Sequence, residues 1–180
     1  MQTMEIFQLI QAALLIYLPA MVANMAPVFA DTYKVLLWLN KPVDFGLSIG
    51  GVRLLGSHKT FRGYVAGTAM GGVTAVILFF LVHVAPYESF VHACIFGCVT
   101  GFAALLGDSI KSFFKRRLSI PSGSRWIPFD QIDFVVGATF GAMLFVRVPI
   151  IVATCAIVSV GFASYIVSSV GVALHMKKNL

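Results

Sequence analysis

The chain has 180 residues, of which 59% are hydrophobic and 11% are charged. Soluble domains have roughly 45–50% apolar and about 25% charged residues, so this composition excludes a water-soluble domain and also a disordered chain. Thirteen Lys and Arg residues against seven Asp and Glu residues give a net charge of +6. In a membrane protein such an excess is typical of cytoplasmic loops, and it also suits a site for an anionic substrate. The composition therefore predicts an integral membrane protein.

Five apolar segments are each near the length of about 20 residues that a helix needs to cross a bilayer. They run over residues 6–30, 64–82, 90–106, 132–145 and 149–174. We expect an all-α integral membrane protein in which residues 1–180 form a single domain. Gly63, Gly67, Gly71 and Gly72 recur along one side of the second segment, which predicts close packing against a neighbouring helix.

The distribution of basic residues predicts how these segments are oriented across the membrane. Two long polar loops, residues 31–63 and 107–131, together with the C-terminal tail hold twelve of the thirteen Lys and Arg residues. The positive-inside rule then predicts that both loops and the C-terminus are cytoplasmic and that the N-terminus lies outside. Five of the seven acids also lie at this face. We therefore expect a multi-pass protein of the cell membrane whose site of function lies on the cytoplasmic face.

The second loop and the segment after it hold three acids that flank a basic run. Asp130 and Asp133 are three residues apart, so a helix places both carboxylates on one face, where they suit a metal ion or simply the start of a helix. Asp108 ends an apolar segment, where the helix dipole disfavours a carboxylate, and this placement calls for another reason. Three carboxylates brought together from two helix ends would suit Mg²⁺.

The basic residues allow two interpretations. Lys111, Lys115, Arg116 and Arg117 lie between the acids and can either clamp phosphates or contact lipid headgroups as a positive-inside cluster. Lys59 and Arg62 lie just before the second apolar segment, and the run Ser-His-Lys-Thr over residues 57–60 is placed for a phosphate contact near a helix start.

These residues resemble a known signature. The run Gly-Asp-x-x-x-Ser-x-x-Lys-Arg-Arg over residues 107–117, the run Pro-Phe-Asp-Gln-x-Asp over 128–133, and His-Lys-Thr-Phe-Arg-Gly over 58–63 are similar to the cytidylyltransferase motifs of CDP-diacylglycerol synthases. Gln131 stands where those enzymes have Arg, Ile-Pro-Phe replaces His-Gly-Gly before Asp130, and the chain is much shorter. These departures match the archaeal branch, the CDP-archaeol synthases, which the chain resembles over essentially its full length.

The resemblance implies a Mg²⁺-dependent enzyme that transfers CMP from CTP to the phosphate of 2,3-bis-O-geranylgeranylglycerol 1-phosphate, giving CDP-archaeol and pyrophosphate. The expected catalytic residues are Asp108, Asp130, Asp133 and Lys111, with the three aspartates as metal ligands. Contacts to CTP or to the lipid phosphate are expected from Lys59, Thr60, Arg62, Ser112, Lys115, Arg116 and Arg117. No nucleic acid is expected as a partner, and a homodimer stays open.

The alternative is a membrane scaffold or a transporter subunit without enzymatic activity, whose basic loops hold anionic lipid. It accounts for the basic clusters and the apolar segments. It does not account for three acids gathered among the bases, and this is why the enzyme is the favoured interpretation.

Overall fold

A computed structural model describes residues 2–56, 58–82, 87–121, 124 and 126–159, and its elements are mostly helical. The elements in chain order are α1 (Gln2–Thr32), the short 3₁₀ helix η1 (Leu37–Leu39), β1 (Ser48–Ile49), β2 (Val52–Arg53), α2 (Phe61–Val82), α3 (Phe90–Arg117) and α4 (Phe129–Ala142). A further short apolar helix covers Ile150–Ser159. Over Gln11–Thr32, Phe61–Val82 and Phe90–Arg117 the helices are long and apolar enough to cross a membrane. The chain is therefore a helical, multi-pass membrane protein, as expected.

The second half of the expected topology needs correction. The loop predicted over residues 107–131 is wrong in its first part, because α3 continues as a helix to Arg117. Three basic residues in its last turn suit the negative end of the helix dipole, and Ser119, with φ 57°, ends the helix in a left-handed conformation. The fourth segment is α4, whose 14 residues cover only about 21 Å at 1.5 Å per residue. The fifth predicted segment, 149–174, begins with the helix at Ile150, and residues 160–174 lie outside the described part.

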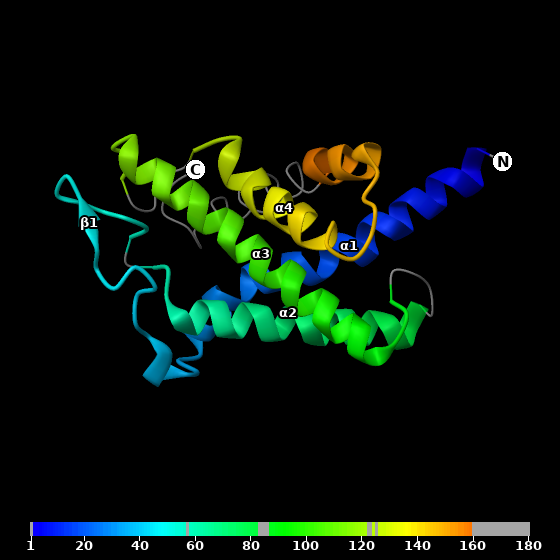
Figure 1. The fold of residues 1–180 in the computed structure, drawn as a ribbon, viewed down its shortest axis with the longest axis horizontal. Coiled ribbons are helices and arrows are strands. Elements are labelled where there is room, and N and C mark those ends of the chain that lie inside the picture. Colours follow the sequence, from blue (N-terminus) through cyan, green and yellow to red (C-terminus); the bar gives the residue numbers. More distant parts are fainter. Residues whose placement is uncertain (1, 57, 83–86, 122–123, 125, 160–180) are drawn as a thin grey trace.

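A small β-hairpin stands in the first loop, where only loop was expected. β1 and β2 pair antiparallel, with Ser48 opposite Arg53 and Ile49 opposite Val52. Gly50 and Gly51 connect them with φ of 61° and 77°, the two positive values that a type I′ hairpin turn requires. The hairpin and η1 lie at one end of the molecule, and the N-terminus of α1 lies at the other end (Figure 1).

Glycines bring the helices close together, as the spacing in the second apolar segment predicts. An added Cβ at Gly71 would lie 2.5 Å from the carbonyl oxygen of Gly97, so α2 and α3 meet backbone to backbone. In the same way, Gly137 of α4 faces the carbonyl oxygen of Ala103 in α3, at 2.2 Å from its hypothetical Cβ. The helices α1 to α4 thus form one packed bundle, and α3 contacts the other three.

Candidate active site

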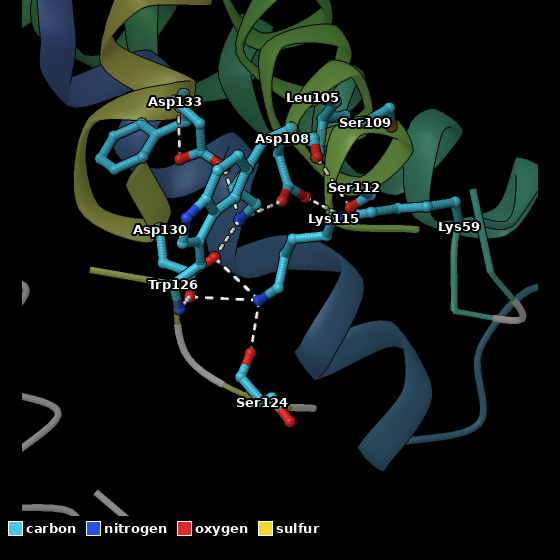
Figure 2. A network of polar contacts seen from close by, with 12 residues as sticks. Lys59, Leu105, Asp108, Ser109, Ser112, Lys115, Ser124, Trp126, Asp130 and Asp133 are labelled. Carbon is cyan, nitrogen blue, oxygen red and sulfur yellow. Dashed lines mark hydrogen bonds and ion pairs between the residues drawn. The ribbon is translucent and has the colours of Figure 1, made fainter. Parts of the chain in front are cut away.

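Three carboxylates converge on one ammonium group between α3 and α4. The Nζ atom of Lys111 lies 3.1 Å from Oδ1 of Asp108, 2.8 Å from Oδ1 of Asp130 and 2.7 Å from Oδ2 of Asp133. Asp108 comes from α3, and Asp130 and Asp133 come from the first two turns of α4 (Figure 2). The three side chains are only 5–21% exposed. The structure therefore brings together all four residues expected to be catalytic.

A second lysine ties the start of α4 to the end of α3. Nζ of Lys115 lies 3.2 Å from both carboxylate oxygens of Asp130 and donates to the carbonyl oxygen of Ser124 (Figure 2). The backbone N–H of Trp126 donates to Oδ2 of Asp130 at 2.6 Å. Burial alone would raise the pKa of Asp130, but the hydrogen bonds from Lys111 and Trp126 and the two lysine charges bring this pKa below its ordinary value. Asp130 is therefore a carboxylate at neutral pH.

The first loop supplies a third lysine to the same cluster. The ammonium of Lys59 forms an ion pair with Oδ2 of Asp108, across from Lys111. Thr60 lies next to it and caps α2, because its Oγ1 accepts a hydrogen bond from the N–H of Gly63 at 3.2 Å. We name Lys59, Lys111, Lys115, Asp108, Asp130 and Asp133 the Lys–Asp cluster. Its three positive and three negative charges balance.

The other expected substrate contacts are engaged with protein groups. The guanidinium of Arg62 is buried and pairs with Asp31 at the end of α1. Nη1 of Arg116 donates to the carbonyl oxygen of Ile120 at 2.7 Å, which caps the end of α3. The Ser112 hydroxyl donates to the carbonyl oxygen of Asp108 at 2.8 Å within its own helix. Arg117 points away from the cluster and holds the β-hairpin, as described below.

Two hollows of different character meet at the Lys–Asp cluster, one with a mixed lining that includes charged side chains and one with an apolar lining. A polar cavity of about 540 Å³ lies between α1, the start of α2 and α3, and its walls include Asp31, Lys59, Arg62 and Asp108. An apolar groove of about 810 Å³ runs between α3 and α4. It is lined mainly by apolar side chains but includes Lys111 and Asp133. The cluster therefore lies between a hollow with charged side chains in its walls and a hollow whose walls are almost wholly apolar.

The structure adds polar residues that the sequence analysis missed. The hydroxyl of Tyr64 lies 2.6 Å from Oγ of Ser109 and 3.3 Å from the carbonyl oxygen of Leu105, at the wall of the polar cavity. Asn24 and Asn40 line the same cavity. Asn24 had a visible signal, since it is an amide inside an apolar segment close to Pro27. A polar group in such a segment is a candidate for a functional site.

The chemistry of the cluster suits a hard cation such as Mg²⁺, because its acceptors are carboxylate oxygens. Oδ2 of Asp133 is buried and no donor meets it with hydrogen-bond geometry, although the Lys111 ammonium lies close to it. The carboxylates surround an ammonium rather than a shared empty position. In the part of the chain that the structure describes, no three His, Cys, Asp or Glu side chains are arranged to hold a metal ion directly. A metal would therefore need the Lys111 ammonium to move aside.

The fold and the site define a helical membrane protein whose charged site lies between a cavity with polar walls and an apolar groove. Comparison with known proteins identifies the family of the chain. The family model described as CDP-archaeol synthase, CarS-like, matches residues 6–180. The chain belongs to the CDP-archaeol synthase family.

Individual relatives agree with this assignment. The chain is 39% identical to the CDP-archaeol synthase of Thermofilum pendens over 73% of this chain and 61% of that protein. It is 35% identical to that of Pyrobaculum aerophilum over 89% of this chain and 92% of that protein. A solved structure described as an intramembrane enzyme for archaeal membrane lipids biosynthesis is 31% identical, with a TM-score of 0.74 over 88% of this chain and 92% of that one.

Proposed function

We propose that this protein transfers CMP from CTP to the phosphate of an archaeal ether lipid, 2,3-bis-O-geranylgeranylglycerol 1-phosphate, to give CDP-archaeol and pyrophosphate. The observation that carries this proposal is the position of the Lys–Asp cluster between the polar cavity and the apolar groove. A nucleotide and an isoprenoid lipid need compartments of these two kinds, and their phosphates must meet between them. The family membership supports the same reaction.

The reaction is a substitution at the α-phosphorus of CTP. A lipid phosphate oxygen attacks this phosphorus, a new P–O bond forms, and the bond to the bridging oxygen between the α- and β-phosphorus breaks. Pyrophosphate leaves with the electron pair. No general base is needed, because a phosphate monoester is already ionised at neutral pH. The demands on the protein are positioning and charge neutralisation, which dominate catalysis of phosphoryl-type transfers.

The residues of the cluster divide this work. Lys59 and Asp108 line the polar cavity, so Lys59 is placed for the CTP phosphates. Lys111 and Asp133 line the apolar groove, so Lys111 is placed for the lipid phosphate. Because the cluster carries no net charge, two polyanionic substrates need additional positive charge. Asp108, Asp130 and Asp133 would hold Mg²⁺, which supplies charge neutralisation at the phosphates and leaving group when it is bound.

The same features support a placement of the site relative to the membrane. The Lys–Asp cluster and the basic end of α3 would lie on the cytoplasmic face of the cell membrane, where CTP is available and where basic residues are enriched. A reporter at the C-terminus tests the predicted cytoplasmic position of that terminus. Protection of the reporter from external protease in intact cells is the expected result, and cleavage would contradict that prediction.

The test of the activity is pyrophosphate release by detergent-purified protein with CTP and the ether-lipid phosphate, with and without Mg²⁺. Release that needs all three components together is expected. No release from protein that still binds CTP would contradict the proposed lipid acceptor. No release and no CTP binding would contradict the cytidylyltransferase proposal as a whole.

A further inference from the structure

Arg117, the last residue of α3, is occupied by the β-hairpin of the first loop. Its Nη1 donates to the carbonyl oxygen of Ile49 at 2.9 Å. Its Nη2 donates to the carbonyl oxygens of Val52 and Arg53 at 2.9 Å and 2.8 Å. The guanidinium also lies over the ring of Phe113, 5.4 Å from its centroid. Both terminal nitrogens are therefore committed to the backbone of another segment, and binding a phosphate would require them to leave three acceptors.

The hairpin depends on such an external contact. Its two strands have two residues each, and an isolated two-stranded hairpin is marginal in water. Phe45, Leu47 and Ile49 are more than half exposed, so the hairpin has little apolar core of its own. Among the contacts of the hairpin in the described structure, Arg117 is the one that connects the strands themselves to α3 by hydrogen bonds.

The hairpin is in turn connected to Lys59. Asp44, at its base, is buried and accepts hydrogen bonds from the N–H of Gly46 at 3.0 Å, the N–H of Leu55 at 3.1 Å and Nη2 of Arg53 at 3.0 Å. Burial acts to raise the pKa of Asp44, but these three donors bring the pKa below its ordinary value, so the carboxylate stays charged. Asp44 therefore joins the two ends of the hairpin.

From Asp44, backbone bonds lead directly to the residue that reaches the cluster. The N–H of Val43 donates to the carbonyl oxygen of Lys59 at 2.9 Å, and the N–H of Phe61 donates to the carbonyl oxygen of Lys41 at 3.0 Å. Residues 41–43 and 59–61 thus run side by side and hold the backbone of Lys59. The first loop is attached to α3 at two points, through Lys59 to Asp108 and through the hairpin to Arg117.

We propose that Arg117 is a positioning residue that fixes the β-hairpin and, through it, the Lys59 ammonium at the Lys–Asp cluster, and that it does not bind a substrate phosphate. The proposal rests on the proposed function only for its kinetic readout. It assigns Arg117 a different role from the lysines of the same basic run, which reach the carboxylates. The forked guanidinium matters for this role, because one lysine ammonium cannot reproduce its two-nitrogen geometry.

The kinetic test is a double-mutant cycle between Arg117→Ala and Lys59→Ala. If Arg117 acts through Lys59, Arg117→Ala displaces the Lys59 ammonium and lowers kcat/KM of the otherwise wild-type protein at least about tenfold. This factor corresponds to the loss of one charge-assisted hydrogen bond made by Lys59. In the Lys59→Ala background the same change then has almost no further effect, since interacting residues are not additive. Equal losses in both backgrounds would overturn the proposal, because a phosphate ligand or a general structural role would act independently of Lys59.

Two further variants keep the test decisive where Arg117→Ala does not fold. Arg117→Lys keeps the charge and should recover little activity, whereas nearly full recovery would indicate a simple electrostatic contact to phosphate. Asp44→Asn leaves Arg117 in place, cuts the connection at the other end of the hairpin, and should show the same non-additivity with Lys59→Ala. Lys34→Ala is the charge-matched control, because Lys34 is an exposed cation of the same loop outside the hairpin. The turnover of this control variant should equal that of the wild type.

Hydrogen exchange gives a readout that does not depend on turnover. In detergent-purified protein without substrate, Arg117→Ala should increase amide exchange over residues 44–55 and leave exchange in α2 unchanged. Unchanged exchange over residues 44–55 would overturn the proposal even if activity falls. If the wild type proves inactive with CTP and lipid, the proposed function fails, while the exchange result still decides the role of Arg117.

Discussion

The two ends of the helical bundle bury polar atoms in different ways. Where α3 ends and α4 begins, six charged side chains are held together in the Lys–Asp cluster. Near the start of α3 and the end of α4, buried polar atoms are instead paired by neutral hydrogen bonds. The Tyr17 hydroxyl lies 2.8 Å from Oγ1 of Thr139, and the Tyr87 hydroxyl donates to the carbonyl oxygen of Leu15 at 2.5 Å.

This difference separates stability from function. A neutral buried hydrogen bond contributes about 1 kcal/mol, whereas a buried group of charges gives little net stability and is costly when one partner is removed. Neutral hydrogen bonds are therefore sufficient to pair buried polar atoms between packed helices. We infer that the charged side chains at the other end serve the activity, so substitutions at the two ends should have different effects on stability and turnover.

The largest effect is expected from Asp133→Asn. A neutral amide is a poor ligand for Mg²⁺, so turnover should fall about a thousandfold while the fold persists. The measurement is pyrophosphate release at matched Mg²⁺, with thermal unfolding and gel filtration as controls for folding. Near-wild-type turnover would remove Asp133 from the metal site and would weaken the contrast between the two ends.

Lys111→Met sharpens the contrast by leaving three carboxylates without their central cation. We expect turnover to fall about a hundredfold, the loss typical of one charge-stabilising group. Stability should fall by about 3 kcal/mol, because a buried charge cluster loses one partner. Added Mg²⁺ should raise the Tm of this variant more than that of the wild type. Equal Mg²⁺ shifts in both proteins would contradict a cation site among these carboxylates.

A smaller effect is expected from filling the apolar groove. Val136→Trp places a large side chain in its wall and should raise KM for the lipid about tenfold, since apolar contacts of this size are worth 1–3 kcal/mol, while KM for CTP stays the same. Val73→Trp is the matched control, because Val73 is an exposed valine on α2. A rise in KM for CTP instead would mean that the groove does not receive the lipid.

The smallest effect is expected at the neutral end. Tyr17→Phe removes one buried hydrogen bond and should lower the free energy of unfolding by about 1 kcal/mol, with turnover unchanged. The loss stays small because the Thr139 hydroxyl keeps its bond to the carbonyl oxygen of Val135. Thermal unfolding and pyrophosphate release measure both quantities. A loss of turnover at unchanged stability would mean that the two ends are coupled.

The candidate site was largely predictable from sequence because its residues lie close together in the chain. Asp130 and Asp133 are one helical turn apart, so helical spacing alone places this pair on one face. Asp108 and Lys111 are also one turn apart, but a loop was expected from residue 107, and it is the continuation of α3 to Arg117 that places them together. Lys59 was predicted from a separate motif, and its position beside Asp108 comes from the fold.

The remainder depended on information that composition does not carry. Hydropathy fell after Leu106 and indicated the end of a helix, yet α3 continues because the following polar side chains still pack against α4. The roles of Arg116 and Arg117 could not be separated from that of Lys115, because a run of cations does not indicate which side of the helix meets the substrate. The hairpin was missed because strands of two residues have almost no periodic signal.

The groove between α3 and α4 has a kinetic consequence. Ile110, Phe114 and Phe140, which line it, are all more than half exposed in the described part of the chain, so the groove opens sideways from helices α3 and α4. We expect its mouth to face the hydrocarbon of a bilayer, so that an acceptor lipid arrives and leaves by lateral diffusion without passing through water. We expect the reaction rate to follow the mole fraction of acceptor lipid in the membrane rather than its amount per volume. Dilution with inert lipid at constant total acceptor should therefore slow the enzyme, as in surface-dilution kinetics.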